Sequence, residues 1–174
     1  ISVEYDISYD AVTLSTENIS ITEELTYQDY KNDWYLSSTG IDKVLEKYKD
    51  KNPPEIRVAV IDTGVNLNSA YLQDRIIKTN YNTAGDGDEN SEQDYEGHGT
   101  KVTSVIANCT TPNVKIANYR CVNRFGEIKS FTLVCTAILQ AIDDGVKAIN
   151  LSLGAPSDFK LLDEILEFAW SSSC

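Results

Sequence analysis

The chain has 174 residues, of which 41% are hydrophobic, and its formal net charge at pH 7 is -12. This length and hydrophobic content are sufficient for one substantial buried core, so a single folded domain is expected. The negative charge would repel nucleic-acid phosphates and anionic lipids, which argues against nucleic-acid and membrane-surface partners. No apolar stretch approaches the about 18 residues of a membrane span, so no membrane insertion is expected.

The N-terminal region differs in pattern from the rest of the chain. Ile1, Val3, Tyr5, Ile7 and Tyr9 alternate with polar residues and precede a polar stretch. This alternation predicts an edge strand followed by a linker. We expect residues 1–33 to be an N-terminal extension, the end of a propeptide or a linker, and residues 34–174 to form the folded domain. Because the chain starts with isoleucine and contains no methionine, it is expected to be a piece of a longer translation product.

Helical and strand patterns alternate after this extension. Ile41, Val44, Leu45 and Tyr48 fall at helical spacing and predict a short amphipathic helix. Nearly continuous apolar runs predict strands that are buried on both faces; they extend from Ile56 to Ile61, from Val114 to Tyr119 and from Val146 to Leu153. Helical periodicity between and after these runs includes Val102 to Ile106, Leu133 to Ile142 and Leu161 to Ala169. The alternation predicts an α/β fold, a parallel sheet with helices on both faces.

A polar loop is expected over residues 80–96, and it contains six acidic side chains: Asp86, Asp88, Glu89, Glu92, Asp94 and Glu96. Its Asp86-x-Asp88-x-Asn90 start resembles a calcium loop, but Ser91 replaces the required glycine and the final glutamate is missing. We favour a solvated surface, and no metal or other cofactor is predicted. The four cysteines lack the paired spacing of a zinc site, and free thiols are favoured over disulfides.

Asp62 follows the first apolar run, in Asp62-Thr63-Gly64. Ligands of open α/β sheets bind outside the carboxyl ends of the strands, which makes Asp62 a candidate site residue. It could instead cap the following turn. The motif also occurs in aspartic proteases, but that chemistry needs a second such motif or a dimer in an all-β fold. The alternation of strands and helices argues against it.

His98 is the only histidine and lies in Gly97-His98-Gly99-Thr100. A lone histidine is more often structural than catalytic. Flanking glycines, however, allow the backbone to pass close to other groups and to open a helix at Thr100. A near-neutral imidazole suits a general base, and a buried carboxylate on its other nitrogen would fix its tautomer. Asp62 is the candidate for that carboxylate.

Three segments, Val58 to Val65, Gly97 to Thr100 and Asn150 to Gly154, together resemble the subtilisin-like serine peptidases, or subtilases, and occur in the family order. The resemblance implies that Asp62 orients the imidazole and that His98 is the general base. It also implies that the backbone of Ser152, Leu153 and Gly154 lines the specificity pocket and pairs with a peptide or protein substrate. The segment Glu127, Ile128 and Lys129 is similar to the opposite substrate-pairing edge.

The family's nucleophile lies in Gly-Thr-Ser-x-Ala, a motif that is absent from this sequence, and Asn150 is not the family's oxyanion-stabilising asparagine. The resemblance therefore implies the N-terminal half of a serine endopeptidase domain, truncated before its C-terminal half and inactive alone. The expected partners are the remaining half and, through the exposed sheet edge, a second copy of the chain. The resemblance also implies a secreted or extracytoplasmic location.

Two other functions remain open from the sequence. The first is a non-catalytic descendant that keeps the groove as a peptide-binding or regulatory module. The second is an unrelated α/β protein, including a nucleotide binder, although no Gly-x-Gly-x-x-Gly follows a strand.

Overall fold

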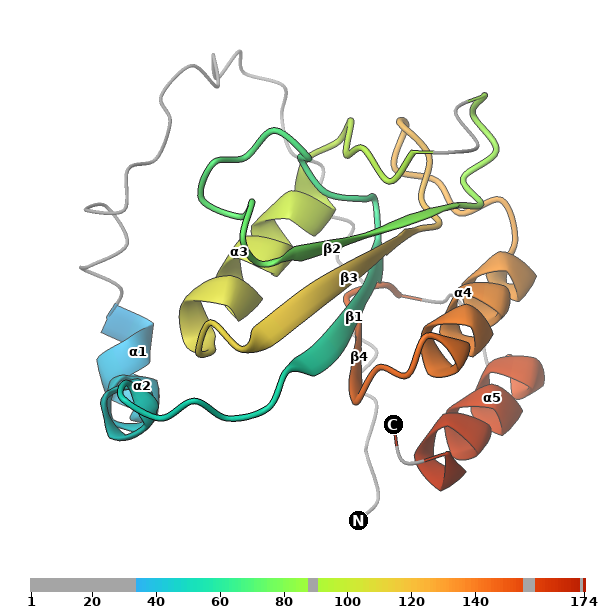
Figure 1. The fold of residues 1–174 in the computed structure, drawn as a ribbon. Helices are drawn as coiled ribbons and strands as arrows, with labels where there is room; N and C mark the ends of the chain where they lie inside the picture. Colours follow the sequence, from blue (N-terminus) through green and yellow to red (C-terminus); the bar gives the residue numbers. More distant parts are fainter. Residues whose placement is uncertain (1–33, 88–90, 155–158, 173) are drawn as a thin grey trace. The chain divides into compact units, whose positions relative to one another are not determined.

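The computed structural model describes residues 34–87, 91–154, 159–172 and 174. They belong to one compact unit, Asn32–Cys174. Its centre is a four-stranded parallel sheet in the order β2-β3-β1-β4 (Figure 1). The strands are β1 Ile56–Asp62, β2 Ile76–Asn82, β3 Val114–Arg120 and β4 Ala148–Leu151. The predicted extension, residues 1–33, lies outside the described residues.

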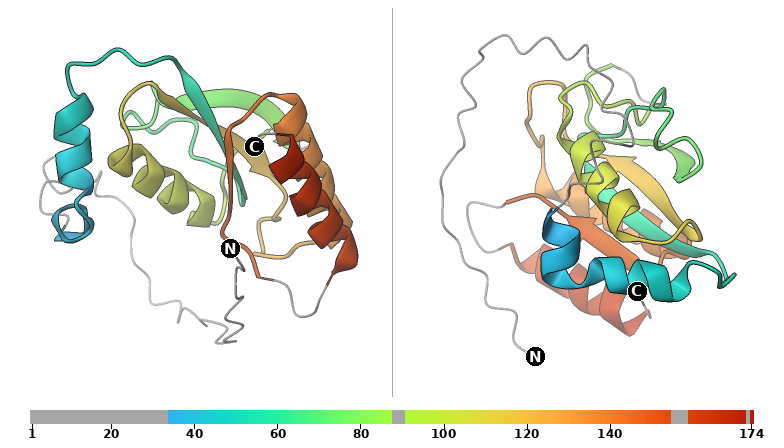
Figure 2. Two further views of the ribbon diagram at one scale, coloured as in Figure 1. Left: turned by 90° about the horizontal axis from the view of Figure 1, so that it is seen from below. Right: turned by 90° about the vertical axis from the view of Figure 1, so that its left-hand side faces the viewer.

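Helices cover both faces of this sheet, as predicted (Figure 2). α3 His98–Cys109 lies on one face, and α4 Phe131–Asp143 lies on the other, where α5 Lys160–Ser171 packs against it. Two further helices, α1 Trp34–Thr39 and α2 Ile41–Tyr48, precede β1. The predicted fold class is therefore confirmed, and the helix expected from Ile41 to Tyr48 is α2.

The two faces have separate apolar clusters because successive side chains of a strand point to opposite sides. Val60 of β1 and Ile116 of β3 belong to the cluster with Ala107 of α3. Ala59, Ile61, Ala117 and Tyr119 belong instead to the cluster beneath α4 and α5. Ala59, Val60 and Ile61 are all inaccessible to solvent, which explains why this strand reads as a continuous apolar run.

β2 was not predicted from the sequence. Its last residues, 80–82, are the first residues of the expected polar loop. Its register against β3 shifts between Ile77 and Tyr81. At this irregularity the two carboxylate oxygens of Glu92 accept the amide protons of Thr79 and Asn80, each at 3.1 Å. Glu92 is completely buried, so the amide groups released by the irregular pairing have a partner from outside the sheet.

β4 is shorter than the predicted run from Val146 to Leu153, because its pairing with β1 covers only Ala148 to Leu151. It lies at the end of the strand order, so no described strand pairs with its outer edge. None of the described helices is long and apolar enough to cross a membrane. None of the four cysteines forms a disulfide bond.

Candidate active site

Asp62 is the last residue of β1, and its side chain is completely buried. Its backbone oxygen accepts the amide protons of Cys121 at 2.9 Å and of Val122 at 3.3 Å. Its carboxylate oxygen Oδ1 accepts the amide proton of Thr63 at 2.7 Å. These bonds fix the end of the strand and the orientation of the carboxylate.

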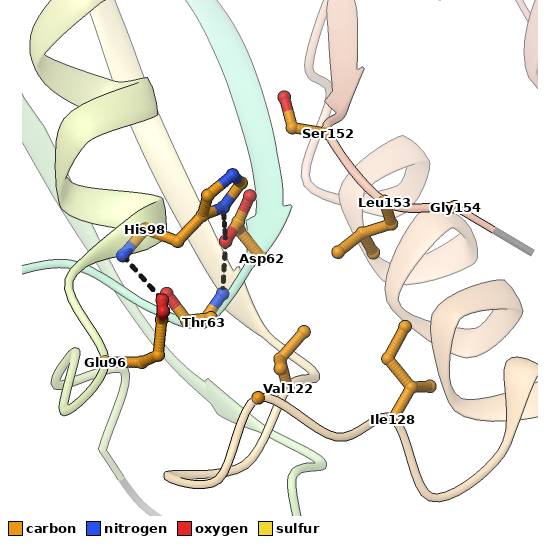
Figure 3. A pocket seen from close by; sticks show the side chains of 10 residues that line it. Asp62, Thr63, Glu96, His98, Val122, Ile128, Ser152, Leu153 and Gly154 are labelled. Atoms are coloured by element: carbon orange, nitrogen blue, oxygen red, sulfur yellow. Dashed lines mark hydrogen bonds and ion pairs between the residues drawn. The ribbon is translucent and has the colours of Figure 1, made fainter. Parts of the chain in front are cut away.

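His98 is the first residue of α3, and its Nδ1 lies 2.8 Å from Oδ1 of Asp62 (Figure 3). Because a carboxylate only accepts, Nδ1 is the nitrogen that carries the proton of the neutral imidazole. The imidazole side chain is 46% exposed, whereas that of Asp62 is 0% exposed. Nε2 is therefore available for a proton from another group. Within the described part of the chain, no hydroxyl or thiol forms a hydrogen bond with it.

Two glycines allow the histidine loop to approach the aspartate loop. A Cβ atom on Gly99 would lie 2.2 Å from the backbone oxygen of Gly64, and one on Gly64 would lie 2.3 Å from that of Glu92. Neither position has room for a side chain. Of the two glycines that flank His98, Gly99 is thus explained by a close backbone contact, whereas Gly97 has no atom within 4 Å of an added Cβ but has a φ of 98°, which favours glycine.

Asp94, which the sequence analysis did not select, joins the two loops. Its Oδ1 accepts the Thr63 hydroxyl at 2.9 Å and the Gly97 amide at 2.7 Å. Its Oδ2 accepts the amide of Thr100 at 2.9 Å and the hydroxyl of the same residue. The Thr63 hydroxyl oxygen in turn accepts the Gly99 amide at 2.8 Å. The only sequence signal was an acidic residue within an acidic loop.

A pocket of about 260 Å³ opens beside the Asp62–His98 pair. It is lined by residues from both loops and from two further segments: Asp62, Thr63, Glu96, His98, Val122, Gly126, Ile128, Ser152, Leu153 and Gly154. Figure 3 places Leu153 on one side of the pocket and Val122 and Ile128 on another. The pocket therefore has one wall that carries His98 and two walls from distant parts of the chain.

Six of the eight residues that the sequence analysis selected line this pocket: Asp62, His98, Ile128, Ser152, Leu153 and Gly154. The other two are not among its lining residues. Glu127 accepts the side-chain amide of Asn123 at 3.1 Å, and Nζ of Lys129 donates to the backbone oxygen of Gly85 at 2.7 Å. The Glu127 side chain is thus engaged within the loop that carries Ile128, whereas the Lys129 side chain is bonded to the segment that follows β2.

Four lining residues were not predicted: Thr63, Glu96, Val122 and Gly126. Glu96, which precedes the N-cap residue Gly97, accepts the amide proton of His98 at 2.8 Å through Oε2 and so satisfies one of the amides at the start of α3 that have no partner within the helix. This arrangement holds the backbone of the histidine as well as its ring. The only signal for this role in the sequence was a glutamate two residues before the start of the helix.

Two other side chains with nucleophilic atoms lie near Asp62 or the pocket: the Cys121 thiol, which is buried, and the Ser152 hydroxyl, which is hydrogen-bonded. Burial raises the pKa of the Cys121 thiol to about 12, and the charge of Asp62 adds to the effect. This thiol is therefore protonated at neutral pH and is a poor nucleophile. The Ser152 hydroxyl accepts the side-chain amide of Asn150 at 2.8 Å.

The described residues contain no group of three or more histidine, cysteine, aspartate or glutamate side chains that could hold a metal ion. Asp86, which begins the calcium-like pattern, forms an ion pair with Arg120. Asp88 and Asn90 lie outside the described residues.

The profile of the subtilase family matches residues 54–171. The thermophilic serine proteinase of Bacillus sp. (strain AK1) is 30% identical over 155 residues, which cover 84% of this chain and 34% of that protein. The intracellular serine protease of Paenibacillus polymyxa is 31% identical over 126 residues, 67% of this chain and 38% of that protein.

Solved structures agree with these relatives. The crystal structure of a lanthipeptide protease matches with a TM-score of 0.63 and 26% identity, and the match covers 83% of this chain and 43% of that one. The chain thus spans between about a third and a half of the length of these three proteins. By its sequence profile and its fold, the chain belongs to the subtilase family.

Proposed function

We propose that this chain supplies the general base and the orienting carboxylate of a serine endopeptidase. The observation that carries the proposal is the contact between His98 Nδ1 and Asp62 Oδ1 at 2.8 Å beside an open pocket. In this reaction Nε2 of His98 accepts the proton of a serine hydroxyl as its oxygen attacks the substrate carbonyl. The imidazolium that forms is stabilised by the buried carboxylate of Asp62 and then returns the proton to the leaving amine.

The proposed nucleophile comes from outside this chain. Two observations support this: the chain spans about a third of the first two relatives, and His98 Nε2 has no described hydroxyl partner. The remaining C-terminal half of the catalytic domain would supply the serine and the oxyanion donor. Because loss of the nucleophile alone costs about six orders of magnitude in turnover, the isolated chain is proposed to be inactive. No cofactor is proposed for this reaction, since the proposed base, orienting carboxylate and nucleophile are all side chains.

The proposed substrate is a peptide held between the two walls of the pocket. Ser152, Leu153 and Gly154 follow the last residue of β4 that pairs with β1, so their backbone continues beyond the sheet. Ile128 and Gly126 line the same pocket from the loop between β3 and α4. Backbone pairing with an extended peptide on these two edges follows the general principle of strand addition.

The outer edge of β4, with which no described strand pairs, is the proposed docking site of the remaining half, whose next strand would continue the sheet. In the isolated chain the same edge would pair with a second copy. Analytical ultracentrifugation of the isolated chain over a concentration series should detect association that addition of the other half suppresses. A strictly monomeric chain at all concentrations would contradict the self-association.

The location is proposed to be extracytoplasmic, and this rests on the family resemblance. The family also includes a relative named as an intracellular serine protease. Cell fractionation tests the location: recovery of the protein from the cytoplasmic fraction would overturn it.

A serine-directed sulfonyl fluoride tests the function in the complete protein that contains this chain. The reagent should abolish peptide hydrolysis, and the modified residue should be a serine outside this sequence. His98→Ala should prevent both hydrolysis and rapid labelling, because no other described group takes the hydroxyl proton. Full hydrolysis after complete labelling would remove the serine mechanism. A protein that binds peptides but is neither labelled nor active would be the non-catalytic module.

A further inference from the structure

One wall of the pocket belongs to the loop between β3 and α4, and this loop is organised by Asn123. The Asn123 side-chain oxygen accepts the amides of Phe125 at 2.9 Å and of Glu127 at 3.0 Å. Its backbone amide donates to the Glu127 oxygen at 2.9 Å, and its backbone oxygen accepts the Gly126 amide at 3.1 Å. These bonds give the turn its internal shape, but they do not attach it to the rest of the protein.

The attachment comes from Gly85 and Asp86, which follow β2. Oδ2 of Asp86 accepts the backbone amide proton of Arg124 at 3.0 Å. The backbone oxygen of Asp86 accepts a second hydrogen bond, from the side-chain Nη2 of Arg124 at 3.1 Å. The backbone oxygen of Gly85 accepts Nζ of Lys129 at 2.7 Å. Arg124 and Lys129 flank Gly126 and Ile128, so the lining segment is held on both sides.

Asp86 is itself anchored to the sheet through Arg120, the last residue of β3. Arg120 is completely buried and forms an ion pair with Oδ2 of Asp86. The guanidinium groups of Arg120 and Arg124 lie 5.0 and 5.4 Å from the centre of the Tyr95 ring. Burial alone raises the pKa of Asp86. The hydrogen bonds from Arg120 and the Arg124 amide, with the charges of both arginines, offset this and lower the pKa below its usual value.

We propose that Asp86 is a positioning residue that holds the pocket wall formed by Gly126 and Ile128 ready for an extended peptide. The inference rests on the proposed peptidase function and adds to it a determinant of substrate binding. Loops between a strand and a helix are ordinarily the more mobile parts of a fold. If the wall is already ordered before the substrate binds, the free energy of binding does not include the entropy cost of ordering it. Since Asp86 has no contact with Asp62 or His98, its loss should weaken binding rather than slow the chemical step.

The experiment uses the complete protein and two substrates. A hexaalanine p-nitroanilide, about 20 Å long when extended, spans the pocket, whereas an acetyl-alanine methyl ester is too short to reach along the wall. For Asp86→Asn we expect KM for the hexapeptide to rise about tenfold, with kcat nearly unchanged. Both constants for the ester should remain at their original values. Glu55→Gln is the matched control, because Glu55 forms an exposed ion pair with Arg57 and does not line this pocket. It should change neither kcat nor KM for either substrate.

Asp86→Asn leaves the buried charge of Arg120 without its counter-ion and could prevent folding. Lys129→Met removes only the bond to Gly85 from an exposed side chain, and it should raise KM for the hexapeptide in the same direction by a smaller factor. An unchanged KM for the hexapeptide in a folded variant, or equal losses with both substrates, would overturn the inference. If the parent protein hydrolyses neither substrate, the proposed peptidase function is contradicted, and this result does not depend on the role of Asp86. The Kd of a fluorescein-labelled hexaalanine, compared between parent and Lys129→Met, then decides the role of the wall.

Discussion

His98 and Asp62 are 36 positions apart in the sequence, yet their side chains meet at 2.8 Å through Nδ1 and Oδ1. One residue ends a central strand and the other begins a helix, so the contact depends on the βαβ arrangement rather than on either loop alone. The buried partner holds the ring, and the half-exposed partner faces the pocket. This division of roles gives the first prediction.

Asp62→Asn in the complete protein should lower kcat by about 10⁴-fold with little effect on folding. The amide nitrogen of asparagine can donate to Nδ1, which then becomes the acceptor and places the ring proton on Nε2. That tautomer cannot take a proton from the proposed serine nucleophile. Steady-state kinetics measure the loss, and circular dichroism checks the fold. Asp144→Asn is the matched control, since this carboxylate accepts the Tyr119 hydroxyl at 2.6 Å outside the pocket. Equal kcat values for the two variants would contradict an orienting role for Asp62.

Asp94→Ala should destabilise the chain by about 3 kcal/mol, because it removes the common acceptor of Thr63, Gly97 and Thr100. The donors are partly or fully buried and would lose a charged partner. Urea unfolding of the chain measures the change. Asp50→Ala, at an exposed position, should stay within about 0.5 kcal/mol of the parent. If the two variants are equally stable, the Asp94 bonds do not hold the loops together.

Gly99→Ala should also destabilise the chain by about 3 kcal/mol, since the added methyl group would lie 2.2 Å from the Gly64 oxygen. Alanine ordinarily stabilises a helix relative to glycine, so the sign distinguishes close packing from helix propensity. Gly154→Ala is the control for stability alone, because nothing lies within 4 Å of its added Cβ atom. A Gly99→Ala chain with an unchanged or raised Tm would show that the two loops separate easily.

The sequence predicted the central part of this fold because its signals are local. β1 and β3 coincide with runs that are nearly continuously apolar, which is the pattern of a strand covered on both faces. α4 begins where Ser130 caps it, with its hydroxyl oxygen accepting the Thr132 amide at 3.2 Å. Asp62 and His98 could be paired because a general-base imidazole needs a buried carboxylate on its other nitrogen, and because the resemblance to the subtilases implies the same pair.

The parts of the fold and the site that were not predicted depend on contacts between residues far apart in the sequence, which no local sequence pattern indicates. β2 has the sequence Ile-Ile-Lys-Thr-Asn-Tyr-Asn, which lacks a clear period, and its irregular pairing is supported by Glu92. Asp94 acquires its role only when the loops around Thr63 and Thr100 converge. Likewise, Asp86 was considered as a possible metal ligand, whereas its partner is Arg120, a buried cation on a distant strand.

Cys121 gives a prediction that is independent of catalysis. Its thiol is completely buried and its pKa is raised to about 12, whereas Cys109 is partly exposed. Iodoacetamide at pH 8.5 should therefore alkylate Cys109 in the native chain and leave Cys121 unmodified, while both react in urea. Peptide mass spectrometry after timed quenching measures each site. Equal native rates would mean that the end of β3 opens as readily as the surface.

The same thiol predicts how stability depends on pH. The ordinary thiol pKa of 9.0 applies to the unfolded chain and the raised value of about 12 to the folded one. Ionisation above pH 9 therefore favours the unfolded state, and the contribution of Cys121 is complete below this pH and declines up to about pH 12. Cys121→Ala removes this contribution. Urea unfolding between pH 8 and pH 10.5 should consequently give a shallower loss of stability for Cys121→Ala than for the parent. Parallel curves would indicate that the thiol reaches solvent in the native state.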